Sequence, residues 1–327
     1  RSLNTSTSLG GVPLATPIGN SANPAATTRQ DLETLAAHGA GWVTCRTCLV
    51  DGFEHDDAIH KWGFGPDDAP NNVNTTNCFG YSPHDDGYYL TALQALKATH
   101  PATPTSLSVV GTAEEVATML KRACDGGDTF ESIDCVEVNL SCPNIPGKPA
   151  ISYDAALLRD YLGAMEDAVA GYATRPRVGV KVAPMLSDHS FANVADALNA
   201  HTDTVSFVVA VNTVGNGLMI DVDTETAVLP HPFGGLGGTA IHNLALGNVH
   251  KLRQLLDAKF SVVGVGGVTD GASVFRFLLA GADAVQTASN LLFEGPTSFG
   301  RLNKELEAIM EAKGYTTLED FKGKLRY

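Results

Sequence analysis

The amino-acid sequence predicts an α/β protein folded as a (β/α)8 barrel, also called a TIM barrel. Short runs rich in β-branched residues alternate with longer amphipathic runs along the whole chain, in about eight pairs. Several short runs are almost continuously apolar, as expected for parallel strands that helices cover on both faces. No low-complexity linker divides the chain, so we expect a single domain over residues 1–327. A doubly wound open sheet is the alternative, because repetition alone does not prove that the sheet closes.

The elements of the barrel can be assigned in chain order. The expected strands are the apolar runs 14–18, 42–44, 106–110, 135–140, 177–182, 206–211, 261–265 and 284–287. The expected helices are the amphipathic runs 28–37, 112–124, 154–170, 193–200, 246–258 and 271–279. Thr112 with Glu115, and Ser190, are typical of helix starts. A last helix, 298–313, is expected to pack outside the barrel.

One long segment, from about residue 51 to residue 89, interrupts this alternation. It is rich in Gly, Pro, Asn, Asp and aromatic residues. A connection of this length inside a barrel is more often functional than a simple connector. We therefore expect an active-site loop region here.

The composition excludes several classes of protein. Hydrophobic residues make up 44% and charged residues 18% of the chain, which is enough for a large core and excludes general disorder. The formal net charge of −14 disfavours nucleic acids and anionic membranes as partners. No apolar run reaches the roughly 20 residues of a membrane span. Six cysteines in 327 residues do not form a disulfide scaffold, so a reducing, cytoplasmic location is expected.

The most informative motif is 136–144, where an expected strand ends in Asn139, Ser141, Cys142 and Asn144. The C-terminal strand ends of a barrel form its active-site face, so these side chains should enter one pocket. Carboxamides can donate to and accept from a planar ligand, and an accessible thiolate can accept a proton. The alternative is that Asn and Ser are capping residues and the cysteine is an inert buried thiol.

Two glycine-rich stretches, 233–238 and 264–268, are candidates for a phosphate cradle. Glycine lets backbone N–H groups approach phosphate oxygens, and the late strands of a barrel are the usual place for such a site. Ala288 and Ser289, at the end of the last strand, could complete the cradle. Ordinary tight turns are the alternative.

Lys181 stands inside an apolar strand, where an ammonium group is costly unless it meets an anion or a polar ligand. The alternative is a lysine on an edge strand that reaches water. We expect no metal site, because Cys45 and Cys48 have no second cysteine pair. The segment 54–57 with His60 is better explained as a solvated acidic loop.

Taken together, these residues resemble the dihydroorotate dehydrogenases, specifically the soluble class 1A group, over about residues 17–324. The most specific match is Asn-Leu-Ser-Cys-Pro-Asn-Ile-Pro-Gly-Lys-Pro at 139–149. Val-Asn-Thr-Val-Gly-Asn-Gly-Leu at 211–218 and Phe-Gly-Gly-Leu-Gly-Gly at 233–238 also match, as does the stretch 305–315. The resemblance implies a (β/α)8 barrel that binds FMN, usually as a homodimer. It implies a CH–CH oxidoreductase of pyrimidine biosynthesis that oxidises dihydroorotate to orotate, with fumarate as the second substrate.

The resemblance also implies roles for individual residues. Cys142 matches the base that removes a substrate C–H proton while hydride passes to flavin N5, and Lys181 matches the lysine that stabilises reduced, anionic flavin. The positions that match the substrate site are Arg46, Asn77, Phe79, Gly80, Tyr81, Asn139, Asn144, Asn212 and Thr213. The positions that match the FMN site are Ser21, Ala22, Arg46, Thr47, Asn139, Lys181, Val211, Gly238, Gly266, Gly267, Ala288 and Ser289, the last four at the phosphate end.

The departures from the family pattern lie mainly on the substrate side. Arg46 stands where the family has a lysine, and Phe79 and Tyr81 stand where it has methionine and leucine. Serine is usual where this chain has threonine, at 47 and 213. The segment 51–76 is longer than usual, and 229–232 replaces a segment that contains a lysine.

These departures leave two other hypotheses open. The first is a divergent paralogue, a dehydrogenase or ene-reductase that acts on another C–C bond beside a carbonyl in secondary metabolism. Either enzyme would bind a small planar carboxylate or imide. The second is a barrel without catalysis that serves as a scaffold, although a scaffold would not need Cys142, Lys181 and the four asparagines together.

Overall fold

The computed structural model describes residues 3–65, 73–125, 133–141, 150–231 and 233–327. Among these residues, eight parallel strands form one nearly closed sheet in the order β3-β16-β15-β10-β9-β8-β7-β4. The strands are β3 (Ile18–Asn20), β4 (Val43–Thr44), β7 (Thr105–Val109), β8 (Cys135–Asn139), β9 (Arg177–Val182), β10 (Val205–Ala210), β15 (Ser261–Val265) and β16 (Ala284–Thr287). The predicted (β/α)8 barrel is confirmed.

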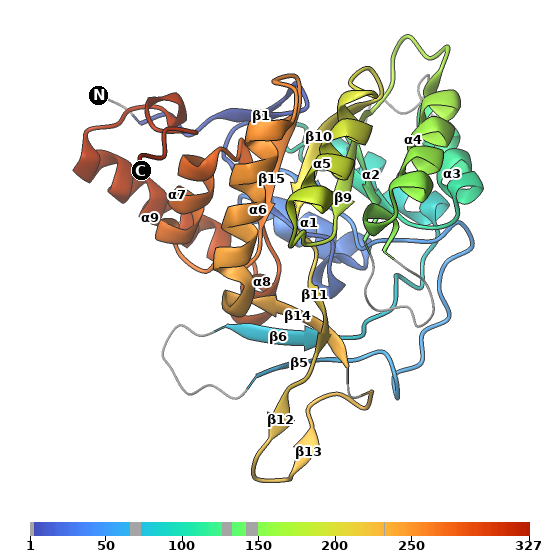
Figure 1. Ribbon diagram of the computed structural model, residues 1–327, viewed down its shortest axis with the longest axis horizontal. Coiled ribbons are helices and arrows are strands. Elements are labelled where there is room, and N and C mark those ends of the chain that lie inside the picture. The colour runs from blue at the N-terminus through green and yellow to red at the C-terminus, as the bar shows by residue number, and fades with distance from the viewer. Residues whose placement is uncertain (1–2, 66–72, 126–132, 142–149, 232) are drawn as a thin grey trace.

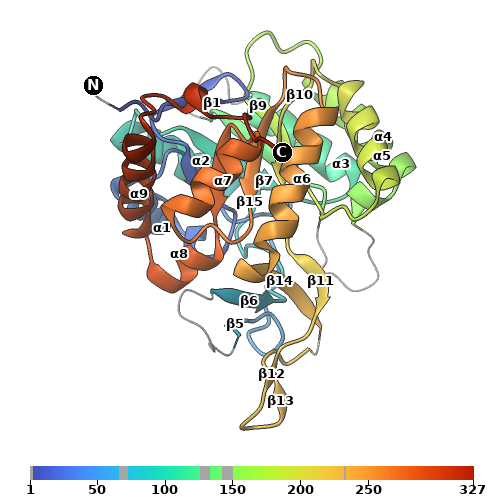
Figure 2. The same ribbon diagram turned by 60° about the vertical axis from the view of Figure 1, so that its left-hand side comes forward.

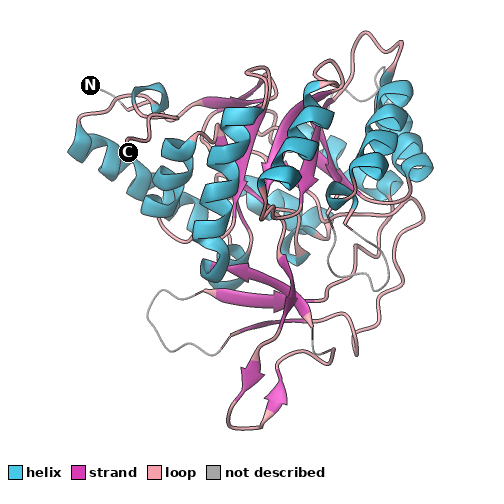
Figure 3. Ribbon diagram, viewed as in Figure 1, coloured by secondary structure: helices cyan, strands magenta, loops and turns pink. Residues whose placement is uncertain are grey.

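Helices surround this sheet on its outside (Figures 1 and 3). They are α1 (Arg29–Ala37), α2 (Asp86–Thr99), α3 (Ala113–Asp125), α4 (Ala155–Val169), α5 (Asp188–Asn199), α6 (His242–Leu255) and α7 (Gly271–Ala280). The short helix α8 (Ser289–Glu294) follows the last strand, and α9 (Ser298–Lys313) packs on α7 beyond the barrel, as predicted. No helix in the described part of the chain is long and apolar enough to cross a membrane.

Local sequence explains where several helices begin and end. Thr28 and Asp31 form a reciprocal capping box at the start of α1, and Asp270 with Ser273 does the same for α7. Gly281 ends α7 with φ 114°, a left-handed conformation that glycine adopts without steric cost.

The seam of the barrel, between β3 and β4, is joined by a side chain. The Nδ2 of Asn20 donates to the carbonyl of Thr44 at 2.7 Å, and its Oδ1 accepts from the amide of Thr44 at 2.9 Å. The carboxamide thus supplies one donor and one acceptor, as a peptide group of a neighbouring strand would. The amide of Gly41, which donates to the carbonyl of Ile18 at 2.8 Å, adds a backbone bond across the same seam.

The N-terminal end of the barrel is closed by a hairpin made of β1 (Thr7–Leu9) and β2 (Val12–Leu14). Leu9 and Leu14 are buried in one cluster with Trp42 and Phe207 inside the barrel. Gly179 leaves room for the ring of Phe207, because a Cβ at Gly179 would lie 2.1 Å from a carbon of that ring. This end of the barrel is therefore a packed core.

The opposite end carries a second, antiparallel sheet in the order β11-β14-β6-β5. Its strands β5 (Trp62–Phe64) and β6 (Asn74–Asn77) come from the long connection after β4, while β11 (Val214–Gly217) and β14 (Gly234–Gly238) come from the connection after β10. Figures 1 and 2 show this sheet beyond one end of the barrel, with the hairpin of β12 (Ile220–Asp221) and β13 (Thr226–Ala227) projecting from it. Two distant insertions thus form a roof over the carboxyl ends of the barrel strands.

The structure corrects several expected elements. The strand expected at 14–18 is two strands, β2 and β3, and Pro17, which has no N–H to donate, lies between them. The region expected as a loop to residue 89 contains β5 and β6 and ends inside α2, which begins at Asp86 and was not predicted. Helix α5 begins at Asp188 and not at 193, because the side chain of Ser187 caps it by accepting from the amide of Ser190.

Candidate functional site

A cavity lies between the carboxyl ends of the barrel strands and the roof sheet, with about 1030 Å³ of empty space up to and including its open mouth. Every predicted site residue in the described part of the chain lines this cavity. They are Ser21, Ala22, Arg46, Thr47, Asn77, Phe79, Gly80, Tyr81, Asn139, Lys181, Val211, Asn212, Thr213, Gly238, Gly266, Gly267, Ala288 and Ser289. Cys142 and Asn144 lie outside the described residues.

Lys181 is the most deeply buried cation of the site, with 6% of the residue exposed. Strand β9 has a neighbour on each side, so the alternative of a lysine on an edge strand is wrong. Its Nζ donates to the Oγ of Ser21 at 2.7 Å, and this is its one hydrogen bond to a described residue. Burial lowers the pKa of Lys181, and the nearby carboxylate of Glu137 opposes that shift. An ammonium group held in this way can receive a negatively charged or carbonyl group from a ligand.

Two of the predicted carboxamides hold each other at the ends of β8 and β10. The Oδ1 of Asn139 accepts from the amide of Ser141 at 3.0 Å and from the Nδ2 of Asn212 at 3.3 Å. Asn212 also donates to the carbonyl of Ser141 and accepts from the amide of Thr213 at 2.8 Å. The NH₂ group of Asn139 has no partner among the described residues, and neither does the buried Oγ1 of Thr213. The NH₂ group of Asn139, which lines the cavity, therefore remains available to a ligand.

Arg46 is the second cation of the cavity, and 9% of it is exposed. It donates to the carbonyl of Phe79 at 3.3 Å and to the Oγ1 of Thr27 at 3.5 Å, and burial lowers its pKa. The carbonyl of Phe79 also lies 3.0 Å from the Nε2 of His55. The same nitrogen lies 3.4 Å from the Nη2 of Arg46, so Arg46, His55 and the carbonyl of Phe79 form one polar cluster. Arg46 is thereby fixed to the loop 78–83, which follows β6 and is called the covering loop below.

The covering loop that follows β6 packs on the inserted segment 53–62. A Cβ at Gly80, where φ is 64°, would lie 2.2 Å from a ring carbon of Phe53. The ring of Phe53 makes an edge contact with Tyr81 at a centroid distance of 5.6 Å, and Trp62 lies 6.3 Å from Phe79. The aromatic residues of the covering loop thus have aromatic partners in the same chain.

The other end of the cavity is built from backbone. Gly267, with φ 67°, leaves no room for a side chain, since a Cβ there would lie 2.8 Å from the Cβ of His242 and 3.0 Å from the carbonyl of Gly238. Among the described residues, the amides of Gly267, Ser289 and Asn290 have no hydrogen-bond acceptor. Convergent free amides without side chains between them are suited to an anion such as a phosphate.

The charge of the cavity is opposite to that of the chain. Arg46 and Lys181 are its charged lining residues in the described part of the chain, and no carboxylate lines it there. The chain as a whole has a formal net charge of −14. The arrangement therefore favours an anionic ligand.

Sequence reasoning missed some contributors to the site. Thr75 lines the cavity, and its hydroxyl lies 2.7 Å from the Oγ of Ser289. His55 does not line the cavity but contacts the covering loop at the carbonyl of Phe79. Thr75 belongs to a polar strand with no apolar pattern, and the segment around His55 resembles a solvated loop. Within the described residues, no group of three or more His, Cys, Asp or Glu side chains is placed to hold a metal ion.

Comparisons with known proteins identify the family of this chain. The family model for dihydroorotate dehydrogenase matches residues 5–310. A protein of Streptococcus pneumoniae serotype 4, named "Probable dihydroorotate dehydrogenase A (fumarate)", is 35% identical over 326 residues, which cover 99% of each chain. A protein of Enterococcus faecalis with the same name is 36% identical over 302 residues, or 91% of each chain. This chain therefore belongs to the dihydroorotate dehydrogenase family, in its class 1A, fumarate-type group.

Proposed function

We propose that this protein is an FMN-dependent dihydroorotate dehydrogenase that oxidises dihydroorotate to orotate and passes the electrons to fumarate. The observation that carries the proposal is the single cavity that gathers every described candidate residue and pairs two buried cations with no described carboxylate. Dihydroorotate, orotate and the phosphate of FMN are all anionic. The names of the relatives support the substrate and the acceptor.

The residues present fit FMN at both ends of the cavity. The glycine cradle, where packing around Gly267 leaves no room for a side chain, suits the phosphate, with the amides of Ser289 and Asn290 as donors. At the other end, the ammonium of Lys181 has capacity for further acceptors and suits the polar edge of the flavin ring. When bound, FMN would supply the acceptor for the hydride that leaves the substrate.

The chain's own residues would carry the other parts of the reaction. Lys181, whose ammonium group is buried, would stabilise negative charge that develops on the ring during the transfer. Arg46 would bind the substrate carboxylate through charge-assisted hydrogen bonds. The carboxamides of Asn77, Asn139 and Asn212 would orient the ring. Cys142, three residues after Asn139, would take the proton from the substrate C–H, an assignment that rests on the sequence motif.

The alternative of a paralogue with another substrate is not favoured. The relatives carry the dihydroorotate name. In addition, Phe79 contacts Trp62, and Tyr81 contacts Phe53. These two departures are therefore explained by packing against the long inserted segment and do not require a different substrate. Arg46, which stands where the family has a lysine, keeps the positive charge at the cavity wall.

Anaerobic mixing with dihydroorotate tests the proposal. The purified protein should show flavin absorbance, which dihydroorotate should bleach and fumarate should restore. A protein without flavin would favour the scaffold hypothesis, and flavin that dihydroorotate does not bleach would contradict the proposed substrate. We further propose a cytoplasmic homodimer that acts in pyrimidine biosynthesis, for which sedimentation of the purified protein is the first measurement.

A further inference from the structure

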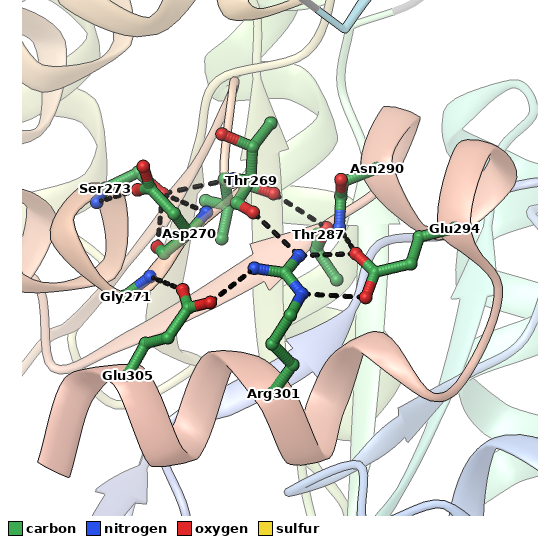
Figure 4. A network of polar contacts seen from close by, with 10 residues as sticks. Thr269, Asp270, Gly271, Ser273, Thr287, Asn290, Glu294, Arg301 and Glu305 are labelled. Atoms are coloured by element: carbon green, nitrogen blue, oxygen red, sulfur yellow. Dashed lines mark hydrogen bonds and ion pairs between the residues drawn. The ribbon is translucent and has the colours of Figure 1, made fainter. Parts of the chain in front are cut away.

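Helix α9 lies outside the eight strand–helix units, yet it reaches the cavity end that carries the glycine cradle. It approaches the start of α7 closely at Gly271, where a Cβ would lie 2.5 Å from the backbone carbon of Glu305. Two of its side chains, Arg301 and Glu305, point toward the loops that follow β15 and β16 (Figure 4).

Arg301 is held by two carboxylates and one backbone carbonyl. Its Nε donates to the Oε1 of Glu294 at 2.7 Å, and its Nη2 donates to the other oxygen of the same carboxylate. Its Nη1 donates to the Oε1 of Glu305 at 2.8 Å, and Nη2 donates also to the carbonyl of Thr269 at 2.9 Å. A guanidinium group that makes such a bidentate contact with a carboxylate has one defined orientation.

The two carboxylates that accept from Arg301 are bonded in turn to one backbone amide and one side-chain amide. Glu305 accepts from the amide of Gly271 through Oε2 at 2.7 Å, and Glu294 accepts from the Nδ2 of Asn290 at 3.0 Å. Thr269 and Asn290 both line the cavity. Arg301 therefore joins the segment 266–271, on one side of the cradle, to the segment 288–294 on the other, as the dashed lines of Figure 4 show.

We propose that Arg301 is a positioning residue for the phosphate end of the cofactor site, which sets the spacing of the two backbone segments that would hold the phosphate. The inference rests on the proposed function. Arg301 does not line the cavity itself, so it acts through Thr269, Glu294 and Glu305. Free amides on two loops bind a phosphate well only if their separation is fixed before binding, because otherwise binding must order the loops.

A purely structural role for Arg301 would have a different signature. If the network only attached α9 to the barrel, its loss would weaken every flavin alike, through general destabilisation. If it sets the phosphate end, its loss weakens FMN and spares riboflavin, which has the same ring and no phosphate. The ratio of the two dissociation constants separates these roles.

The experiment titrates the flavin-free full-length protein with FMN and with riboflavin, followed by quenching of flavin fluorescence. For Arg301→Gln we expect the dissociation constant for FMN to rise by about tenfold, the change that ~1.4 kcal/mol of lost binding produces. The dissociation constant for riboflavin should change by less than about twofold. Glu294→Gln, which keeps the side-chain volume, should shift the ratio in the same direction and serves if Arg301→Gln does not fold.

The matched control is Arg122→Gln, which removes a guanidinium from the buried carboxylate of Asp86, outside the cavity lining. It should leave the ratio unchanged even if it lowers the melting temperature. An unchanged ratio in both Arg301→Gln and Glu294→Gln would overturn the inference while the proposed function stands. A wild-type protein that binds FMN no better than riboflavin would overturn the inference as well, and one that binds neither flavin would also refute the proposed function.

Discussion

Replacing Asn20 by alanine would remove both hydrogen bonds by which this side chain joins the first barrel strand to the second. The amide and the carbonyl of Thr44 are its partners, at 2.9 and 2.7 Å. Asn20 and Thr44 are both fully buried, so water cannot take over the lost bonds without opening the seam. The change therefore leaves one donor and one acceptor unsatisfied in the core.

The size of the effect follows from these two groups. An unsatisfied buried polar group costs about 1–3 kcal/mol, so two such groups should lower the free energy of unfolding by about 3 kcal/mol. That is a large share of the roughly 5–15 kcal/mol that stabilises a typical domain. The loss should be concentrated at the seam, because the other edges of the strands keep their ladder bonds.

Urea unfolding of the flavin-free protein measures the loss in the free energy of unfolding, and hydrogen exchange shows whether that loss is concentrated at the seam. Asn248→Ala is the matched control, since Asn248 is also buried and bonds to the amide and the carbonyl of one residue, Met185, at 2.8 and 3.1 Å. Both variants should lose stability, but only Asn20→Ala should speed exchange of the Thr44 amide beyond the rate that global unfolding explains. A loss below about 1 kcal/mol with a protected Thr44 amide would refute the role of Asn20 in closing the barrel.

Four further predictions concern the site. Cys142→Ala should slow flavin reduction by dihydroorotate about 10²–10⁴-fold with FMN still bound, and a parental rate would exclude this thiol as the base. Lys181→Met should slow reduction and lower the flavin midpoint potential; if rate and potential both stay unchanged, Lys181 does not act on the flavin. Arg46→Met should raise the orotate dissociation constant, measured by flavin difference spectra, about 10- to 100-fold, and unaltered binding would contradict the carboxylate contact. Arg301 holds the pKa of Glu294 below its usual range, so this stabilisation is complete above the usual carboxyl pKa and is lost as the pH falls through the lowered one. Glu294→Gln should accordingly flatten the acid limb of the thermal stability profile, and an identical limb would show that the pair adds nothing.

The barrel was predictable because its strands are local, apolar and regularly spaced. The runs 177–182, 261–265 and 284–287 match strands β9, β15 and β16 residue for residue. Strand β6 has the sequence Asn-Thr-Thr-Asn and pairs with β14, a strand made mostly of glycine and distant in the chain. Neither strand has a hydrophobic period, so the sequence of 233–238 indicates a cradle or a turn and not a strand.

Site residues were predictable from the sequence where they belong to a motif at a strand end. They were unpredictable where only the folding of distant segments brings them to the site. Asn139 and Lys181 stand at strand ends of one sheet, so their meeting follows from the topology. The contact of His55 with the carbonyl of Phe79 depends on how an irregular segment folds back, and no residue pattern encodes it. The role of Arg301 cannot be predicted from the sequence either, because two of its partners, Glu294 and Thr269, lie outside its own helix α9.

Buried cations in a strongly acidic protein have a consequence for the kinetics of encounter. An anion in solution is first met by the field of a chain with net charge −14, and only inside the mouth by Arg46 and Lys181. Dissolved salt screens charges beyond about 8–10 Å. It therefore weakens the repulsion by the outer surface of the protein more than the attraction by the two buried cations. An enzyme that steers its substrate electrostatically loses association rate as salt is added. This protein should instead capture its anionic ligands faster as the ionic strength rises from very low values.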